Sequence, residues 1–132
     1  MKDGPIETTA ALHESIRKAL RNLGLSDADE KASVRRTFQA LRIAVNDEFA
    51  TLDWLLRSLP DCLAPGGRVA ILTFHSGEDR RVKKAFQSGH HDGTYAAINT
   101  EVVRAGADET RANPRASSAK LRWAMRNPTG GT

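Results

Sequence analysis

The sequence predicts an α/β protein in which a helical segment precedes a small sheet of about three strands. Three observations predict it: apolar residues recur at helical spacing through residues 8–59, a nearly continuous apolar run covers residues 68–74, and apolar and basic residues alternate after Ser118. The second pattern is typical of a strand covered on both faces, and the third of a strand with one buried face. Because 132 residues is the usual length of one domain, we expect residues 1–132 to form a single domain.

Two helical stretches are expected before the first strand. A hydroxyl N-cap at Thr8 or Thr9 begins the first stretch, and Gly24 ends it. The second starts at Ser26, and its apolar stripe continues through residues 26–59. The helical segment is therefore predicted to cover residues 1–59.

A stripe as long as residues 26–59 indicates either one extended helix or two helices with a break. Asn46 and Asp47 are poor helix formers and mark the weakest point. Pro60 or Pro65 is expected to close the stretch, because proline cannot continue a helix.

The apolar run at residues 68–74 is the strongest strand prediction. Ser76 and Asp79 fit a capping box, so a helix is expected to follow directly, as in half of a parallel α/β unit. Residues 87–94, rich in glycine and histidine, are predicted to form a loop, and residues 95–103 a second strand.

The end of the chain is predicted to add one more strand. Residues 106–114 are turn-rich, and the alternation that follows predicts a strand through residues 118–126. The last two strands are then adjacent and antiparallel, and Trp123 is expected in the core. A disordered tail is expected at Gly130 and Gly131.

Composition limits the class of protein. Twenty Lys and Arg against sixteen Asp and Glu give a net charge of +4, which favours anionic partners, nucleic acid among them, without requiring one. Cys62 is the only cysteine and is expected to be a small buried hydrophobe. With no apolar run long enough to span a membrane and no signal-peptide pattern at the start, we expect a soluble cytoplasmic protein.

Three stretches resemble the RsmH/MraW family of S-adenosylmethionine-dependent enzymes, which methylate the exocyclic N4 of a cytosine in small-subunit ribosomal RNA. They are residues 36–48 (RTFQALRIAVNDE), residues 66–80 (GGRVAILTFHSGEDR) and residues 113–122 (NPRASSAKLR). Their order and spacing are similar to those of the family, and three motifs in order are far more specific than one. Residues 6–9 more weakly resemble a segment of the family's helical insertion.

The resemblance implies the C-terminal part of a Rossmann-like methyltransferase sheet at residues 66–126. It implies that residues 1–59 match the end of the helical insertion and the following helix. Two positions depart from the family pattern: Gly77 replaces a usual leucine, and Ser117 replaces a usual arginine.

The resemblance names S-adenosylmethionine as the family's cofactor. Its site in the family is a Gly-rich strand, turn and helix in the N-terminal half, followed by acidic and aromatic residues. The 132 residues contain no such Gly-rich stretch, so this chain is not expected to bind the cofactor alone. The expected protein is inactive alone or a subunit of a split enzyme. The first strand should have one open edge, which favours a homodimer or a companion cofactor-binding chain.

Candidate substrate-pocket residues are Phe74, His75 and Ser76 at the end of the first strand, together with Asn46 and Asp47. Methyl transfer to an amine depends on positioning, and these side chains offer acceptors for the amine hydrogens. No residue is a firm catalytic candidate. His75 alternatively bonds a neighbouring loop, Ser76 caps a helix, and Asn46 and Asp47 mark a helix break.

Basic residues near the end of the chain are the candidates for RNA contact. From residue 104 to residue 126 the chain carries six basic and two acidic residues, and Lys120, Arg122 and Arg126 are expected to share one strand face. Arg115 in the third motif is a further candidate. The alternative is a solvated charged face.

No metal site is expected. Residues 90–92, two histidines and an aspartate, are the only hint of a metal cluster, and adjacent histidines point in different directions. Two further functions stay open: a small RNA-binding module, and a structural protein that forms a homodimer. The sequence does not decide whether a partner chain restores activity or whether the gene product has decayed.

Overall fold

The computed structural model describes residues 5–129. The chain divides into two compact units with their boundary between Glu48 and Phe49. The predicted tail at Gly130 and Gly131 lies outside the described residues, as do the first four residues. The α/β fold class is confirmed, with helices preceding an antiparallel sheet.

The first unit contains α1 (Thr9–Leu20), a short 3-10 helix η1 (Arg21–Leu23) and α2 (Asp27–Asn46). The Thr8 hydroxyl accepts a hydrogen bond from the Ala11 N–H at 3.1 Å, and Ser26 caps α2 in the same way. Both predicted helix starts are therefore confirmed, and each satisfies an N–H group that the helix cannot pair internally.

The long apolar stripe forms two helices. Asp47 adopts a left-handed conformation with φ of 49°, and its N–H bonds the Ile43 carbonyl to end α2. The helix α3 (Glu48–Cys62) follows at once and contains Pro60 two residues before its end. The break predicted at Asn46 and Asp47 is confirmed, whereas Pro60 does not close the helix.

The sheet of the second unit has three strands within the described residues: β1 (Arg68–Thr73), β2 (Tyr95–Ile98) and β3 (Lys120–Arg126). Its order is β1-β3-β2, and β3 is antiparallel to both neighbours. The last two strands are thus adjacent and antiparallel, as predicted. Because β3 lies between β1 and β2 and is antiparallel to both, β1 and β2 have the same direction. The helix α4 (Ser76–His91) connects them.

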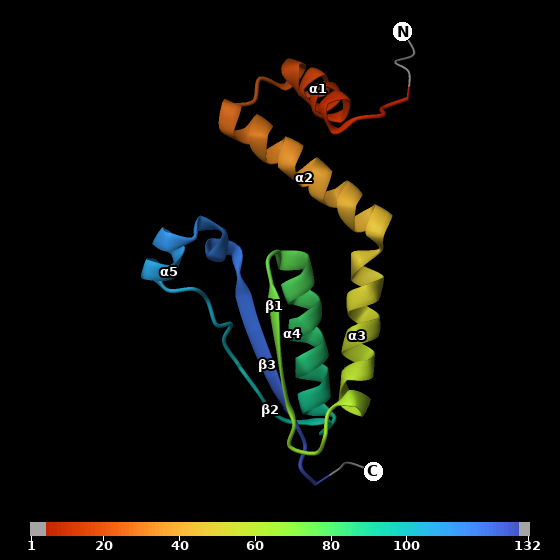
Figure 1. Ribbon diagram of the computed structural model, residues 1–132, viewed down its shortest axis with the longest axis vertical. Helices are drawn as coiled ribbons and strands as arrows, with labels where there is room; N and C mark the ends of the chain where they lie inside the picture. Colours follow the sequence, from red (N-terminus) through yellow and green to blue (C-terminus); the bar gives the residue numbers. More distant parts are fainter. Residues whose placement is uncertain (1–4, 130–132) are drawn as a thin grey trace. The chain divides into compact units, whose positions relative to one another are not determined.

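The core lies between α4, α3 and one face of the sheet (Figure 1). Its buried residues come from every layer: Leu56, Val82, Phe86, Tyr95 and Ala124. The Phe86 and Tyr95 rings meet edge to face with centroids 5.6 Å apart.

The opposite face of the sheet carries apolar side chains that stay partly exposed in this unit. Ala70 pairs with Trp123 and Leu72 with Leu121, so these four residues share that face. Leu72 is 53% exposed and Trp123 is half-buried. The expectation of a strand covered on both faces is therefore wrong within this unit, and Trp123 lies outside the core.

Several sequence predictions in the second unit need correction. The helix α4 continues to His91, so the predicted loop at residues 87–94 is mostly helical. The strand β2 ends at Ile98, although an isolated bridge joins Val103 to Leu121. Cys62 is exposed at the end of α3, not buried.

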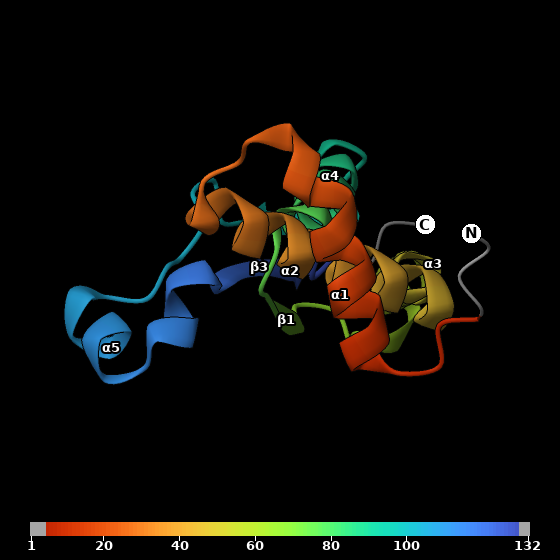
Figure 2. The same cartoon turned by 90° about the horizontal axis from the view of Figure 1, so that it is seen from above.

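The turn-rich segment at residues 106–114 holds the short helix α5 (Ala107–Ala112), and a 3-10 helix η2 (Pro114–Ser118) follows it. Both views show α5 to one side of the sheet (Figure 2). Asn113 ends α5 and caps η2, since its Oδ1 accepts the Arg115 N–H at 3.2 Å.

Candidate functional site

The turn that joins β1 to α4 holds three of the predicted pocket residues. Phe74 and His75 link the two elements, and Ser76 is the first residue of α4. The helix cap is His75: its Nδ1 accepts the N–H groups of Gly77 at 3.2 Å and Glu78 at 3.5 Å. The capping box predicted from Ser76 and Asp79 is therefore wrong, because both side chains lie inside the helix and the residue before them provides the acceptor.

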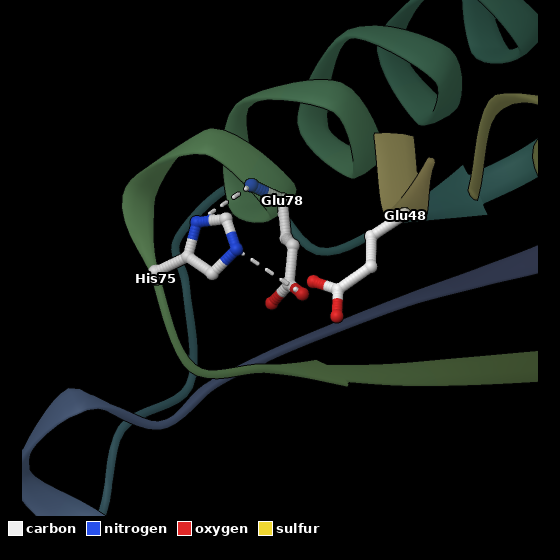
Figure 3. Close-up of side chains that lie close together, drawn as sticks. All are labelled: Glu48, His75 and Glu78. Atoms are coloured by element: carbon white, nitrogen blue, oxygen red, sulfur yellow. Dashed lines mark hydrogen bonds and ion pairs between the residues drawn. The ribbon is translucent and has the colours of Figure 1, made fainter. Parts of the chain in front are cut away.

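Glu78, in the first turn of α4, contacts both Phe74 and His75 of this turn (Figure 3). One carboxylate oxygen accepts the Phe74 N–H at 3.2 Å, and the other lies 3.2 Å from His75 Nε2. Since Nδ1 accepts hydrogen bonds, the proton of a neutral His75 ring sits on Nε2. That nitrogen is buried and has no hydrogen-bonding partner of good geometry among the described residues. His75 thus shapes the turn and does not present a free base at the surface.

Phe49, at the start of α3, packs on the other side of the turn. Its ring meets the His75 ring edge to face with centroids 5.8 Å apart, and the Arg81 guanidinium lies 4.4 Å from its centroid. A Cβ on Gly77 would lie 2.8 Å from Phe49 Cζ. Glycine at this position, where the family resemblance leads one to expect leucine, therefore leaves room for the Phe49 ring.

A buried ion pair joins the second and third sequence motifs. Asp79, in the first turns of α4, accepts Arg122 Nε at 2.7 Å and Arg122 Nη2 at 3.2 Å. Each residue is only 8% exposed. The hydrogen bond from the Arg122 guanidinium holds the pKa of the Asp79 carboxyl below its usual value. This contact between residues 43 positions apart joins the two sequence motifs into one structural unit.

The basic side chains of β3 share one face, as predicted, but that face turns toward α4 and α3. Lys120 Nζ lies 3.9 Å from the Asp79 carboxylate, and Arg126 donates a hydrogen bond to the Leu63 carbonyl. Lys120, Arg122 and Arg126 therefore do not form a stripe exposed to solvent. Alternation along β3 places their side chains on one face of the sheet and those of Leu121 and Trp123 on the other face. A role for the three basic residues in RNA contact stays a prediction.

The other candidates lie elsewhere. Arg115 is exposed in η2. Asn46 and Asp47 belong to the first unit, where Asn46 donates to Glu48 Oε1 at 3.4 Å and Asp47 ends α2. His90 Nδ1 lies 3.0 Å from the Tyr95 carbonyl oxygen, which accounts for the first histidine of the pair without a metal.

Two residues that contact His75 in this turn were not predicted as part of the site. A carboxylate three residues after a cap, as at Glu78, is a recognised signal for a helix start. Phe49 carried no signal, because its contact with His75 depends on how α3 packs against the turn.

Comparison with known proteins places these features in a family. Residues 1–127 match the MraW methylase family, and the chain belongs to that family. It is 49% identical over 123 residues to ribosomal RNA small subunit methyltransferase H 1 of Lachnoclostridium phytofermentans, covering 92% of this chain and 34% of the relative. It is 43% identical over 141 residues to ribosomal RNA small subunit methyltransferase H of Solidesulfovibrio magneticus, covering 96% of this chain and 43% of the relative.

The chain therefore spans about a third of the length of the first of these relatives and somewhat more of the second. Over residues 5–129, no helix combines the length and apolar character needed to cross a membrane.

Proposed function

We propose that this chain is the RNA-facing C-terminal part of a ribosomal RNA methyltransferase that acts on a cytosine amine. The observation that carries the proposal is the Asp79–Arg122 pair, which binds the second and third family motifs into one folded unit. The relatives named above are called ribosomal RNA small subunit methyltransferases, which supports RNA as the substrate class. The turn at Phe74, His75 and Ser76 is the proposed substrate side, with His75 in a positioning role.

In this proposal the methyl donor is held by sequence that this chain does not contain. The family's cofactor is S-adenosylmethionine, and its Gly-rich strand, turn and helix have no counterpart in these 132 residues. S-adenosylmethionine is a nucleoside without phosphate groups. In this proposal the backbone N–H groups and carboxylate of the Gly-rich segment hold it, and side chains at the end of β1 do not replace them. The chain alone is then inactive, and it acts with the remaining part of the enzyme.

Calorimetry with S-adenosylmethionine tests whether the site for the methyl donor lies outside this chain. The purified chain should give no saturable heat. A mixture with the part of the Lachnoclostridium phytofermentans relative that this chain does not match should transfer a labelled methyl group to small-subunit ribosomal RNA. The relative's segment without this chain is the control. Micromolar one-to-one binding of the donor by the chain alone would overturn the proposal that the donor site lies outside it.

A companion chain or a second copy is a further proposal, supported by the sheet. Among the described strands, β1 pairs with β3 alone, so its other edge offers unpaired N–H and C=O groups next to the apolar face around Leu72. Sedimentation of the chain should show association that rises with concentration. Ala70→Lys, which places a charge on the exposed face of β1, should reduce it, and a wild-type chain that stays monomeric at high concentration would contradict the homodimer.

A further inference from the structure

The face of the sheet that points away from the core is apolar on all three strands. The residues that share it, called the bare face below, are Ala70 and Leu72 of β1, Ala97 of β2, and Leu121, Trp123 and Met125 of β3. A hollow of about 620 Å³ lies along this face, and Leu72 at its side is 53% exposed. An apolar patch that spans three strands marks a contact with another protein segment more often than a solvated surface.

The side chains of the bare face differ in size in a way that forms the hollow. Ala70 pairs with Trp123, and Ala97 pairs with Met125, so a small side chain lies beside a large one at two places. In protein cores the side chains of a facing element fill such gaps, because few voids remain there. The bare face therefore has the shape of a core surface whose second layer lies outside this unit.

The strand β1 indicates which kind of element forms that second layer. Val69 and Ile71 pack against the core, whereas Ala70 and Leu72 lie on the bare face, so β1 is apolar on both sides. Sheets with such strands carry helices on both faces. The residues that line the hollow all come from the strands, so no described helix of this unit covers it. A helix is the element that this face lacks.

The lengths of the relatives indicate where such a helix comes from. This chain covers 34% of the Lachnoclostridium phytofermentans relative and 43% of the Solidesulfovibrio magneticus relative, so most of each relative lies outside the match. The unpaired edge of β1 borders the hollow, and a strand added in parallel at that edge brings a connecting helix with it. A second copy fits less well, because two hollow faces do not fill each other.

The charge at one end of the hollow restricts the partner further. Among the described residues that line it, only Arg68 is charged, and Arg68 is exposed opposite Met125. An acidic side chain at the corresponding end of the partner helix is complementary to it.

We propose that the bare face binds an amphipathic helix from the part of the enzyme that this chain does not match, with Leu72 and Trp123 in the contact and an acidic side chain of that helix near Arg68. This inference rests on the proposed function for the existence of the remaining part. It goes further by naming the surface, the kind of element and the residues that join the two parts.

The test is the affinity of this chain for the unmatched part of the Lachnoclostridium phytofermentans relative, measured by sedimentation. Leu72→Glu places a charge in the contact and should weaken binding by at least about tenfold, whereas Leu72→Met should bind like the wild type. Leu23→Glu is the matched control, because Leu23 is 64% exposed in η1 of the first unit. Since Leu72 is also exposed, circular dichroism should show the same fold for all variants. Arg68→Glu should weaken binding less, by about threefold.

A spectroscopic measurement locates the contact directly. The chain has two tryptophans, Trp54 and Trp123, so labelling with 5-fluorotryptophan gives two ¹⁹F signals. The Trp123 signal should shift on binding and lose its sensitivity to D₂O, because the partner helix covers a side chain that is half-buried in the chain alone. Trp54, 64% exposed on α3, provides the reference signal outside the bare face.

The outcomes separate this inference from the proposed function. A complex that forms with wild-type affinity in Leu72→Glu and leaves the Trp123 signal in place overturns the assignment of the surface alone. A Trp123 signal that shifts with the concentration of the chain itself, before mixing, assigns the bare face to a second copy and overturns the helix. The relative's own matching segment is the positive control for the fold of the unmatched part. If that segment binds and this chain does not, the proposal that the chain acts with the remaining part of the enzyme fails as well.

Discussion

Arg122 and Asp79 form a buried ion pair in the second unit. An arginine and an aspartate that are each 8% exposed lose most of their hydration, and the two hydrogen bonds between them compensate for it. Removing one partner leaves the other charged and buried, which is far more costly than replacing both by apolar side chains.

Asp79→Asn should therefore destabilise the protein by about 3–5 kcal/mol at neutral pH. The pKa of Asp79 is lowered in the folded chain, so the contribution of the pair is complete above the ordinary carboxyl value of 3.8 and is lost as the pH falls through the lowered folded value. Urea unfolding followed by circular dichroism from neutral to strongly acidic pH measures this. Wild type and variant should converge in acid.

The double variant Asp79→Leu with Arg122→Met is the control, because it removes both charges and should be more stable than Asp79→Asn. A constant difference between wild type and Asp79→Asn at all pH values would contradict an ionised pair.

His75 provides the second residue-scale prediction. His75→Ala removes the acceptor for the N–H groups of Gly77 and Glu78, so thermal unfolding should show a loss of about 1 kcal/mol. His75→Asn supplies a side-chain acceptor at the same position and should recover most of it. Equal stability of the alanine and asparagine variants would show that capping is not the role of this side chain.

At the scale of elements, the helix α4 depends on a close contact with β2. A Cβ on Gly89 would lie 2.5 Å from Tyr95 Cδ2, so only glycine lets the buried tyrosine ring approach the helix this closely. Burial of that ring raises the pKa of Tyr95.

Gly89→Ala should consequently destabilise the second unit by about 1–3 kcal/mol through overpacking, although alanine is the better helix former. Ser88→Ala changes the neighbouring exposed position and should be neutral or slightly stabilising. Urea denaturation midpoints compare the two. A gain in stability for Gly89→Ala would mean that helix propensity outweighs the contact with Tyr95.

The elements that local chemistry decides were predictable from sequence. The caps at Thr8 and Ser26, the break at Asp47 and the strand before Phe74 each follow from a few neighbouring residues. Elements that involve distant contacts were not: α4 runs through the glycine-rich region, where Gly89 packs against Tyr95, and the local pattern does not contain that contact.

The same distinction holds for the site. The sequence placed His75 at the end of a strand, but its role as a cap depends on its rotamer and on the N–H groups of the next turn. The alternation of apolar and basic residues in β3 correctly predicted that Lys120, Arg122 and Arg126 share one face of the strand. It did not indicate which face of the sheet the helix α4 covers. The Asp79 carboxylate on that helix settles the matter for Arg122.

At the scale of the whole molecule, the two compact units are stabilised by different contacts. The first unit is a pair of helices in which Val34 is buried, with an ion pair between Arg17 of α1 and Glu30 of α2. The second unit has a sheet, two packed helices and a buried core, and it carries the turn at His75. RNA contact is therefore expected to depend chiefly on the second unit.

The most direct test of the RNA-facing role is the affinity of this chain for a labelled small-subunit ribosomal RNA hairpin over a series of salt concentrations. Phosphate contacts release counterions, so the logarithm of the association constant should fall linearly with the logarithm of the salt concentration, by about 0.7–0.9 for each phosphate that a Lys or Arg neutralises. A chain that shows no affinity at low salt, or an affinity that salt does not change, would contradict an RNA-facing function.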